Sequence, residues 1–404
     1  MPALVQSVAE LAALPAVRAT IDWFRRERAW INDQHLKLCR IPAPTFFEQK
    51  RAEWMAERLK SLGWDAKLDR AGNVVATLPG WRDTPVVAVT AHLDTVYAPR
   101  LAEDIKMNGG GRFTGPGVSD NGAGLAALLA LAAAWSAAPP LRDTPLAPML
   151  VANVGEEGEG NLSGMRYLCR ASHLPKLRAL LVLDGPSTEH ITCQALASRR
   201  FEVAVTGAGG HSWSDSGVGN PVHALSRAIT LFTDEAAAFA TAPPRTSFNF
   251  GVIEGGSSIN SIPNEAHAKV DLRSENAARI ERMAALLASS LERAVEIENA
   301  RSAGGRVNGR VKEIGSRPAG SLPADAPIVE CVRAVDAHLG IRSHLDCSST
   351  DANIPLSLGL PAVSIGAGGQ GGGAHTTAEW FQPEGRERGL TRVLLALCVL
   401  LGSG

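Results

Sequence analysis

The chain has 404 residues, which is enough for two or three domains. Its content of 45% hydrophobic and 20% charged residues is ordinary for a soluble globular protein. The net charge of −1 and the pI near 6.8 give no reason to expect a nucleic-acid partner, so small polar substrates remain the open class.

The six cysteines are dispersed and form no Cys-x-x-Cys pair, so neither a thiolate metal site nor a disulfide framework is expected. The N-terminal apolar stretch lacks a basic flank and contains Glu10, which favours a helix over a signal peptide. The longest alanine–leucine run, 125–134, is too short to span a bilayer. We therefore predict a cytoplasmic protein with reduced cysteines and no membrane partner.

The first predicted elements follow a short polar segment. Residues 45–48, Thr-Phe-Phe-Glu, have the pattern of a capping box, which predicts a helix that begins there and ends at Gly63. Residues 72–78 and 86–90 are expected to form the next two strands.

Residues 123–135 are nearly all Ala and Leu, which predicts a helix that is buried on most sides. The apolar stretches 148–154 and 179–183 predict two further buried strands. Strands that alternate with helices favour a three-layer α/β domain.

Acidic or imidazole side chains follow three of these predicted strands. They are His92, the pair Glu156 and Glu157, and Asp184. In open α/β sheets, ligands bind at the carboxyl ends of strands. Neighbouring carboxylates at the end of a buried strand repel each other unless a cation lies between them. A structural role is the commoner one for any single His or Asp, but three such groups at three strand ends are hard to explain in that way.

Two more segments, around Asp120 and His375, also place an acidic or imidazole side chain beside small residues. Two histidines and three carboxylates, one of them bridging, can neutralise and orient a pair of divalent cations. The pattern therefore suggests a two-metal hydrolase in which Glu156 is left over to move protons.

The sequence changes character near Ser198. The following stretch predicts a strand–helix–strand–strand–helix–strand order, with elements at 200–205, 221–239, 247–253, 266–273, 277–294 and 307–314. This order is that of a ferredoxin-like unit. The first domain is expected to resume near Arg317 and to end with an apolar helix at 389–401.

Three motifs together resemble the M20 family of metallopeptidases. They are His-x-Asp-x-Val at 92–96, Ser-Asp-Asn-x-x-Gly at 119–124 and Glu-Glu at 156–157, which Asp184 follows after 26 residues. The resemblance extends from about Arg40 to Trp380.

This resemblance implies an α/β fold with a three-layer zinc-peptidase catalytic domain in two parts, 1–197 and 316–404. An inserted ferredoxin-like α+β dimerisation (lid) domain would occupy 198–315. A homodimer that forms through the inserted domain is expected.

The resemblance also implies a ligand set for two divalent metal ions. Asp120 would bridge both ions, His92 and Asp184 would complete the shell of one, and Glu157 and His375 that of the other. Zinc is the first expectation for both ions. Mixed histidine and carboxylate ligands also accept cobalt or manganese, so the native metal stays open.

Glu156 would then be the general base that deprotonates the metal-bound water and later gives a proton to the leaving amine. Asp94, two residues after His92, would hold the ring of His92 in its ligating tautomer. In this family the peptide between Asp120 and Asn121 is typically cis.

Three positions of the inserted domain match family residues that reach the substrate. His211 resembles a histidine that crosses the dimer and polarises the scissile carbonyl oxygen. Asn260 and Arg273 resemble residues that bind the polar end of the substrate, and the planar fork of Arg suits a carboxylate. A turn around His211 and a surface ion pair at Arg273 are the structural alternatives.

The segments 348–353 and 366–375 look more like the peptidase T-like branch than the aminoacylases. Within the first of them, Asp351 is expected either to face a free α-amino group of the substrate or to fix the loop. We therefore expect a dinuclear di- or tripeptidase that acts by metal-hydroxide attack. The alternatives are an N-acyl-amino-acid deacylase or carboxypeptidase with the same site and, less favoured, a non-catalytic binding protein.

Overall fold

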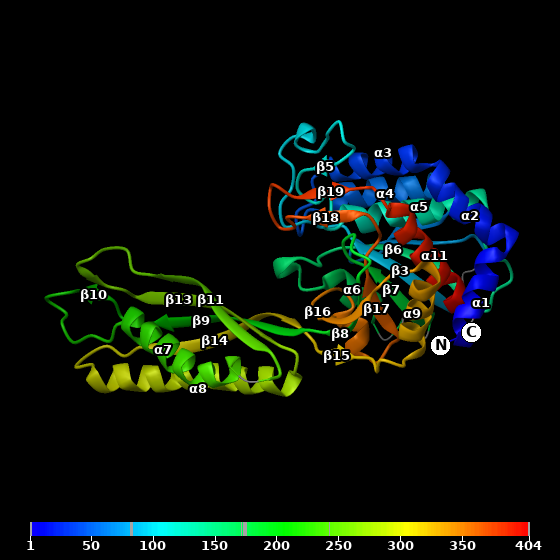
Figure 1. The fold of residues 1–404 in the computed structure, drawn as a ribbon. Coiled ribbons are helices and arrows are strands. Elements are labelled where there is room, and N and C mark those ends of the chain that lie inside the picture. Colours follow the sequence, from blue (N-terminus) through cyan, green and yellow to red (C-terminus); the bar gives the residue numbers. More distant parts are fainter. Residues whose placement is uncertain (1, 81–83, 171, 173–175, 242, 403–404) are drawn as a thin grey trace. The chain divides into compact units, whose positions relative to one another are not determined.

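The structure, a computed structural model, describes residues 2–80, 84–170, 172, 176–241 and 243–402. The chain divides into two compact units, which Figure 1 shows in ribbon form. The main unit comprises residues 1–195 and 320–404, and the inserted unit comprises residues 196–319. The domain boundaries predicted from the sequence, 198 and 315, fall inside the inserted unit.

A mixed sheet forms the centre of the main unit. Its strands within the described residues are β1 (Asp65–Leu68), β2 (Val74–Thr77), β3 (Val86–His92), β6 (Ala147–Asn153), β7 (Leu177–Leu183), β8 (His190–Ala195), β15 (Gly320–Ser321), β16 (His344–Ser348) and β17 (Ala362–Ile365). Their order is β1-β2-β6-β3-β7-β17-β8-β15, and β16 pairs with β8. Strand β3 runs parallel to both β6 and β7, so the carboxyl ends of these three strands meet at one edge of the sheet.

Helices cover both faces of this sheet. One face packs against α1 (Pro2–Ala13), α2 (Pro15–Arg26), α3 (Arg28–Cys39), α4 (Gln49–Ser61), α5 (Gly122–Ala137), α9 (Pro327–Leu339) and α11 (Arg386–Gly402), and the other against α6 (Ser163–Leu168) and α10 (Asn353–Ser357). Side chains of β3 alternate between the two cores, with Val87 and Val89 in the first and Val86 and Ala88 in the second. The predicted three-layer α/β architecture is confirmed.

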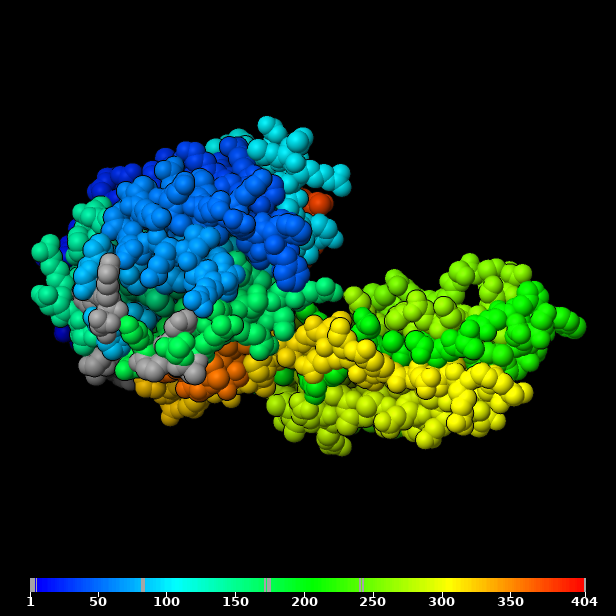
Figure 2. Space-filling model, turned by 180° about the vertical axis from the view of Figure 1, so that it is seen from behind, coloured from blue at the N-terminus to red at the C-terminus, as the bar shows by residue number. Residues whose placement is uncertain are grey.

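The N-terminal segments form a large part of the main unit's surface on one side, where Figure 2 draws them in blue. Within the described residues, no helix is long and apolar enough to cross a membrane. All six cysteines are described and free, and all except Cys347 are buried.

The predicted capping box before α4 is wrong. The helix begins at Gln49, and no side chain makes a capping hydrogen bond to its first turn. Instead, the Thr45 hydroxyl donates to the Asp94 carboxylate at 2.9 Å, and the Glu48 carboxylate accepts the backbone N–H of Gly155 at 3.1 Å. Both side chains therefore bind loops that follow strands of the central sheet. Asp94 lies after β3 and Gly155 lies after β6.

Helix α5 is almost completely buried, as its Ala–Leu sequence predicts. Its N-cap is Asn121, whose side chain accepts the backbone N–H of Gly124 at 3.1 Å. The loop before α5 leads from a small antiparallel sheet, whose strands are β4 (Lys106–Met107), β5 (Phe113–Thr114), β18 (Gln370–Gly372) and β19 (Trp380–Gln382). The N-terminus of α5 is thus tied to segments from the C-terminal part of the chain.

The inserted unit is a four-stranded antiparallel sheet with two helices. Its strands β9 (Ala197–Thr206), β11 (Thr246–Gly255), β13 (Glu265–Ser274) and β14 (Asn308–Arg317) have the order β11-β13-β9-β14. Helices α7 (Pro221–Ala240) and α8 (Ala277–Arg301) pack on the sheet through a shared apolar core. The short strands β10 (Gly210–His211) and β12 (Ser261–Ile262) pair with each other. The predicted ferredoxin-like element order is confirmed.

Candidate metal centre

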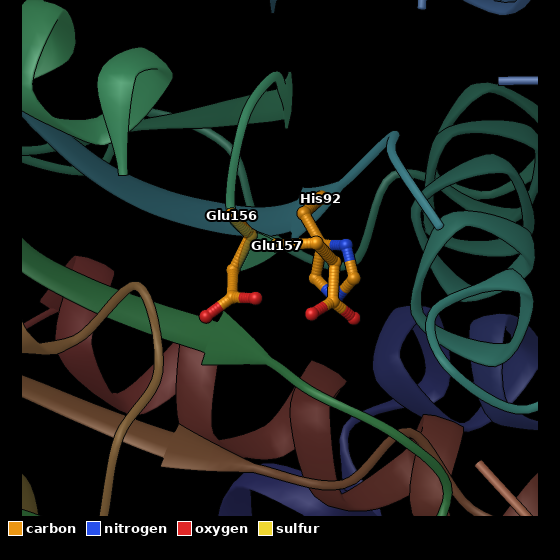
Figure 3. A group of neighbouring side chains, drawn as sticks. All are labelled: His92, Glu156 and Glu157. Carbon is orange, nitrogen blue, oxygen red and sulfur yellow. The ribbon is translucent and has the colours of Figure 1, made fainter. Parts of the chain in front are cut away.

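The main unit gathers polar side chains where β3, β6 and β7 end. His92 is the last residue of β3 and is paired in register with Asn153 at the end of β6. Glu156 and Glu157 follow β6, and Asp184 follows β7. Figure 3 shows the side chains of His92, Glu156 and Glu157 pointing to the same side of the backbone. The parallel register of the three strands therefore brings these groups together.

Two further loops complete the group. The Asp120 carboxylate lies with Oδ1 3.0 Å from His92 Nε2 and with Oδ2 3.1 Å from His375 Nε2. His375 Nε2 is also 3.0 Å from Glu157 Oε1. The two oxygens of one carboxylate thus face two different histidines. The Asp120–Asn121 peptide is cis.

The donor atoms form three groups that could each hold a metal ion, and one of them consists of His92, Glu156 and Glu157. Ligand atoms of His92, Asp120 and Asp184 lie within 4.8 Å of one another, and so do those of Asp120, Glu157 and His375. Zinc binds histidine nitrogen and carboxylate oxygen at roughly 2.0–2.2 Å, so atoms with this spacing can share one ion. Only Asp120 belongs to both sets, which is the arrangement that a bridging carboxylate requires.

The electrostatics of the cluster point to a deficit of positive charge. Burial and the charge of Asp120 raise the pKa of Asp184 to about 7. Hydrogen bonds with Asp120 and Glu157 raise the pKa of His375 to about 10. Burial lowers the pKa of His92, but hydrogen bonds with the carboxylates of Asp120 and Asp94 raise it well above the ordinary value. Crowded carboxylates stabilise the positive charge of a nearby histidine, and they would stabilise a bound divalent cation in the same way.

Asp94 holds the backbone of the two glutamates. It is completely buried, and its carboxylate accepts the backbone N–H of Glu156 at 3.0 Å and that of Glu157 at 2.8 Å. Nδ1 of His92 is 2.9 Å from the main-chain oxygen of Asp94 and 3.6 Å from its carboxylate. The nearer acceptor for the His92 ring is therefore the carbonyl, whereas the side chain mainly fixes the Glu156–Glu157 loop.

Asp351 is also buried, at 1% exposure, and its carboxylate accepts a hydrogen bond from the Asn153 side chain at 2.6 Å. Asn153 is the register partner of His92. This contact favours the loop-fixing role among the two roles considered for Asp351.

One buried acid of this region was missed by the sequence analysis. Glu379 is 2% exposed, and its carboxylate accepts three backbone N–H groups of the loop that carries Asp120. Burial raises the pKa of Glu379 to about 7, against the lowering effect of those three amides. Its only sequence signal is its place four residues after His375, because binding to backbone amides leaves no pattern of residue types.

The three predicted substrate residues of the inserted unit lie in different settings. His211 is exposed on β10, and its Nδ1 accepts the backbone N–H groups of Trp213 and Ser214, each at 3.3 Å. In the neutral ring the proton therefore belongs on Nε2, which becomes a donor. Asn260 lies in the turn before β12, where its side-chain oxygen accepts the Ser258 hydroxyl at 2.6 Å.

Arg273 lies near the end of β13, with its side chain 41% exposed. Its Nε donates to the Asp271 carboxylate at 2.6 Å, and Arg200 contacts the other oxygen of that carboxylate at 3.1 Å. The structure therefore contains the ion pair that was the structural alternative for Arg273, and it leaves part of the guanidinium accessible.

Two family models match this chain. A model of the peptidase dimerisation domain matches residues 197–298, which lie in the inserted unit. A model of peptidase family M28 matches residues 73–208. The second span contains five residues of the cluster, namely His92, Asp120, Glu156, Glu157 and Asp184.

Similar proteins agree with these matches. The chain is 24% identical over 352 residues to the uncharacterised protein YqjE of Bacillus subtilis (strain 168), covering 83% of this chain and 89% of that one. It superposes on a tripeptidase from Staphylococcus aureus with a TM-score of 0.73 and 20% identity, over 92% and 98% of the two chains. The di-peptidase Dug1p of Saccharomyces cerevisiae gives a TM-score of 0.71 at 15% identity, over 96% and 98%. The peptidase dimerisation domain and the acid- and histidine-rich cluster at the strand ends, taken with these matches, support an M20 family metallopeptidase and a metal-dependent hydrolase.

Proposed function

We propose that the protein is a dinuclear metallopeptidase that hydrolyses the amide bond of small peptides, with di- and tripeptides as substrates. The observation that carries this proposal is the Asp120 carboxylate, whose two oxygens lie 3.0 and 3.1 Å from the Nε2 atoms of two histidines. That geometry suits a carboxylate shared by two cations, with His92 and Asp184 on one side and Glu157 and His375 on the other. Zinc is the first choice for both ions.

When bound, such cations would lower the pKa of a water molecule and polarise the scissile carbonyl. Glu156 would take the proton of the attacking water and deliver it to the leaving amine. Its backbone N–H is held by Asp94, and its side chain lies with His92 and Glu157 in one group of possible ligand atoms. This proximity supports Glu156 as the group that would exchange a proton there.

The inserted unit would supply the second catalytic contact. The Nδ1 atom of His211 accepts backbone N–H groups, so Nε2 of the neutral ring is a donor for the carbonyl oxygen as negative charge develops on it. By the family resemblance this histidine acts on the site of the partner in a homodimer. Asn260 and Arg273 would bind the polar end of the substrate.

A small peptide is the substrate that the related folds support, because they include a tripeptidase and a di-peptidase.

The burial of Asp351 favours a second candidate substrate class. An acid that is 1% exposed and bonded to Asn153 is poorly placed to receive a free α-amino group. N-acyl amino acids, which have no such group, therefore remain the alternative substrate class for the same site.

The metal-loaded protein should be tested on di- and tripeptides in parallel with N-acetyl, N-succinyl and N-carbamoyl amino acids. We expect turnover of peptides, and we expect blocking the α-amino group to reduce it strongly. Preference for the N-acyl compounds would establish the deacylase alternative, and no hydrolysis of either class would refute the proposed function.

Glu156→Gln keeps the size of the side chain but removes the proton acceptor. We expect a loss of roughly 10²–10⁴-fold in turnover with unchanged metal content. Glu159→Gln, an exposed change on the same loop, is the matched control and should leave turnover near that of the wild type. A Glu156→Gln protein that holds its metals and keeps wild-type turnover would move the general-base role to another residue.

A further inference from the structure

The loop that carries Asp120 is held by the buried carboxylate of Glu379, which belongs to none of the groups of possible metal-ligand atoms. Oε2 of Glu379 accepts the N–H of Gly117 at 2.7 Å, and Oε1 accepts those of Ser119 at 2.6 Å and Asp120 at 2.7 Å. Glu379 is 2% exposed, so water does not compete well for these bonds. Three donors converge on one side chain.

This convergence requires a carboxylate in particular. An ionised carboxylate only accepts hydrogen bonds, whereas a Gln at the same place would turn an N–H₂ donor toward at least one backbone N–H. A buried N–H without an acceptor is unfavourable, so the loop with Gln would shift or lose a contact.

The segment that carries Glu379 also carries His375. The backbone of this segment is joined to the same loop at a further point, where the N–H of Gly115 donates to the Glu379 carbonyl oxygen at 2.9 Å. Directly beyond, Trp380 and Phe381 of β19 pair with β5. One short segment therefore presents His375 and fixes the loop that presents Asp120.

The Asp94 carboxylate provides an independent parallel. It is buried, lies outside the candidate ligand groups and accepts the backbone N–H groups of Glu156 and Glu157 at 3.0 and 2.8 Å. Two of the loops that carry candidate ligands are thus each held through their amides by a buried acid. The repeated arrangement suggests that backbone position, as well as side-chain identity, is controlled at this site.

We propose that Glu379 is a positioning residue of the metal centre, which fixes the backbone at Asp120 so that both oxygens of its carboxylate reach their separate partners. This inference rests on the dinuclear site proposed above. Because Asp120 is the candidate bridge, a shift of its backbone should weaken both cation sites together. Loss of His375 alone, in contrast, should weaken mainly one of them.

The test is the affinity of the full-length chain for Co²⁺ and Zn²⁺, measured by competition with a chelator. For Glu379→Gln we expect both affinities to fall by roughly 10–100-fold, the usual effect of removing a partner that orients a metal ligand. Glu384→Gln is the matched control, since it removes the same charge from an exposed position five residues away and should bind both ions as the wild type does. A residue needed only for folding would change the unfolding midpoint of Glu379→Gln and leave the affinities of the folded protein unchanged.

Hydrogen exchange of the unaltered protein gives a second measure that does not depend on a variant folding. In the metal-free chain, the amides of Gly117, Ser119 and Asp120 should exchange slowly, because Glu379 already holds them. Rapid exchange there, or wild-type affinities in folded Glu379→Gln, would overturn the inference. A wild-type chain that binds no divalent ion would instead refute the proposed function, so the two failures are distinguishable.

Discussion

At the scale of single residues, the same chemical group has different surroundings within one small region. Asp120 and Glu157 face histidine nitrogens, which suits metal ligands. Asp94 and Glu379 face backbone N–H groups, which suits the fixing of loops. Partners, and not residue type, separate these roles. The same reasoning applies to Arg273, whose guanidinium already has one carboxylate partner.

Arg273→Ala tests whether this guanidinium binds the carboxylate of the substrate. Losing a charge-assisted contact should cost roughly 1.5–3 kcal/mol, about a tenfold to hundredfold fall in kcat/KM. The fall should be large for a dipeptide with a free C-terminal acid and small for the matching amide, so the measurement compares kcat/KM on the two compounds.

Arg200→Ala is the control for this measurement, because Arg200 contacts the same Asp271 carboxylate from the neighbouring strand. It should leave kcat/KM nearly unchanged on both compounds. An equal loss on acid and amide in Arg273→Ala would mean that Arg273 orders the inserted unit and does not bind the carboxylate.

Three of the five candidate ligands could be predicted from the sequence because they lie at the ends of apolar strands, whereas Asp120 and His375 rest on the motifs of the family resemblance. His92 ends one apolar strand and Asp184 directly follows another, and a histidine or an acid in that place has few structural explanations. Glu379 and Thr45 could not be predicted in the same way. Their partners are backbone amides in one case and a carboxylate 49 positions away in the other, and neither contact leaves a local pattern.

At the scale of elements, helix α3 supports the loop before α5. His35 on α3 is buried, its Nε2 donates to the Val118 carbonyl at 2.8 Å, and its Nδ1 accepts from the Arg386 guanidinium at 2.7 Å. Cys39, one turn later, lies with its sulfur 3.5 Å from the Gly117 carbonyl oxygen. The loop is thus held from α3 as well as from Glu379.

This arrangement predicts a loss of stability in mild acid. Burial and the Arg386 charge lower the pKa of His35 well below its ordinary value. An unfolded histidine titrates near pH 6.5, so below that pH the unfolded chain binds more protons and the free energy of unfolding falls. The contribution of one such group is at most about 1.4 kcal/mol per pH unit.

The free energy of unfolding should therefore be measured from about pH 8 to about pH 5 for the wild type and His35→Gln. The variant should be less stable at neutral pH, and its disadvantage should shrink as the pH falls. His190 also has a lowered pKa, but it is common to both proteins and cancels in the difference. His338→Gln, a change at an exposed position, is the control, and its free energy of unfolding should follow that of the wild type across the pH range. A difference between wild type and His35→Gln that stays constant with pH would exclude this role for His35.

Long elements with a clear period were predictable, and short connections were not. The burial of α5 follows from its composition, and the alternation of β9 and β13 follows from their period of two. The error at residues 45–48 has a definite cause. A capping box needs its side chains to bind the first turn of the helix, but Asp94 and the Gly155 amide are competing partners that only the folded sheet brings near.

At the scale of the whole molecule, the proposed function requires residues of both units. The candidate ligands belong to the main unit, and His211, Asn260 and Arg273 belong to the inserted unit. If His211 acts across a homodimer, the association is isologous and each site combines residues of both chains. An intact site then requires a Glu156 from one chain and a His211 from the other.

Mixing two inactive proteins tests this arrangement. His211→Ala and Glu156→Gln subunits should regain roughly a quarter of wild-type activity after statistical exchange, because half of the dimers carry one intact site of two. The activity should rise with the time course of subunit exchange, which can be followed with a tagged chain. Each variant mixed with itself is the control. Demonstrated exchange without any recovery would assign His211 to its own chain or to no catalytic role.

The ratio of metal to protein tests most directly whether a pair of cations shares Asp120. Elemental analysis of fully active protein should find two divalent ions per chain, because five ligands in two sets need a bridge to fill both. Asp120→Ala should lose both ions, whereas Asp325→Ala, an exposed change in the same unit, should retain both. One ion per chain in a fully active protein, or two retained in Asp120→Ala, would contradict the account.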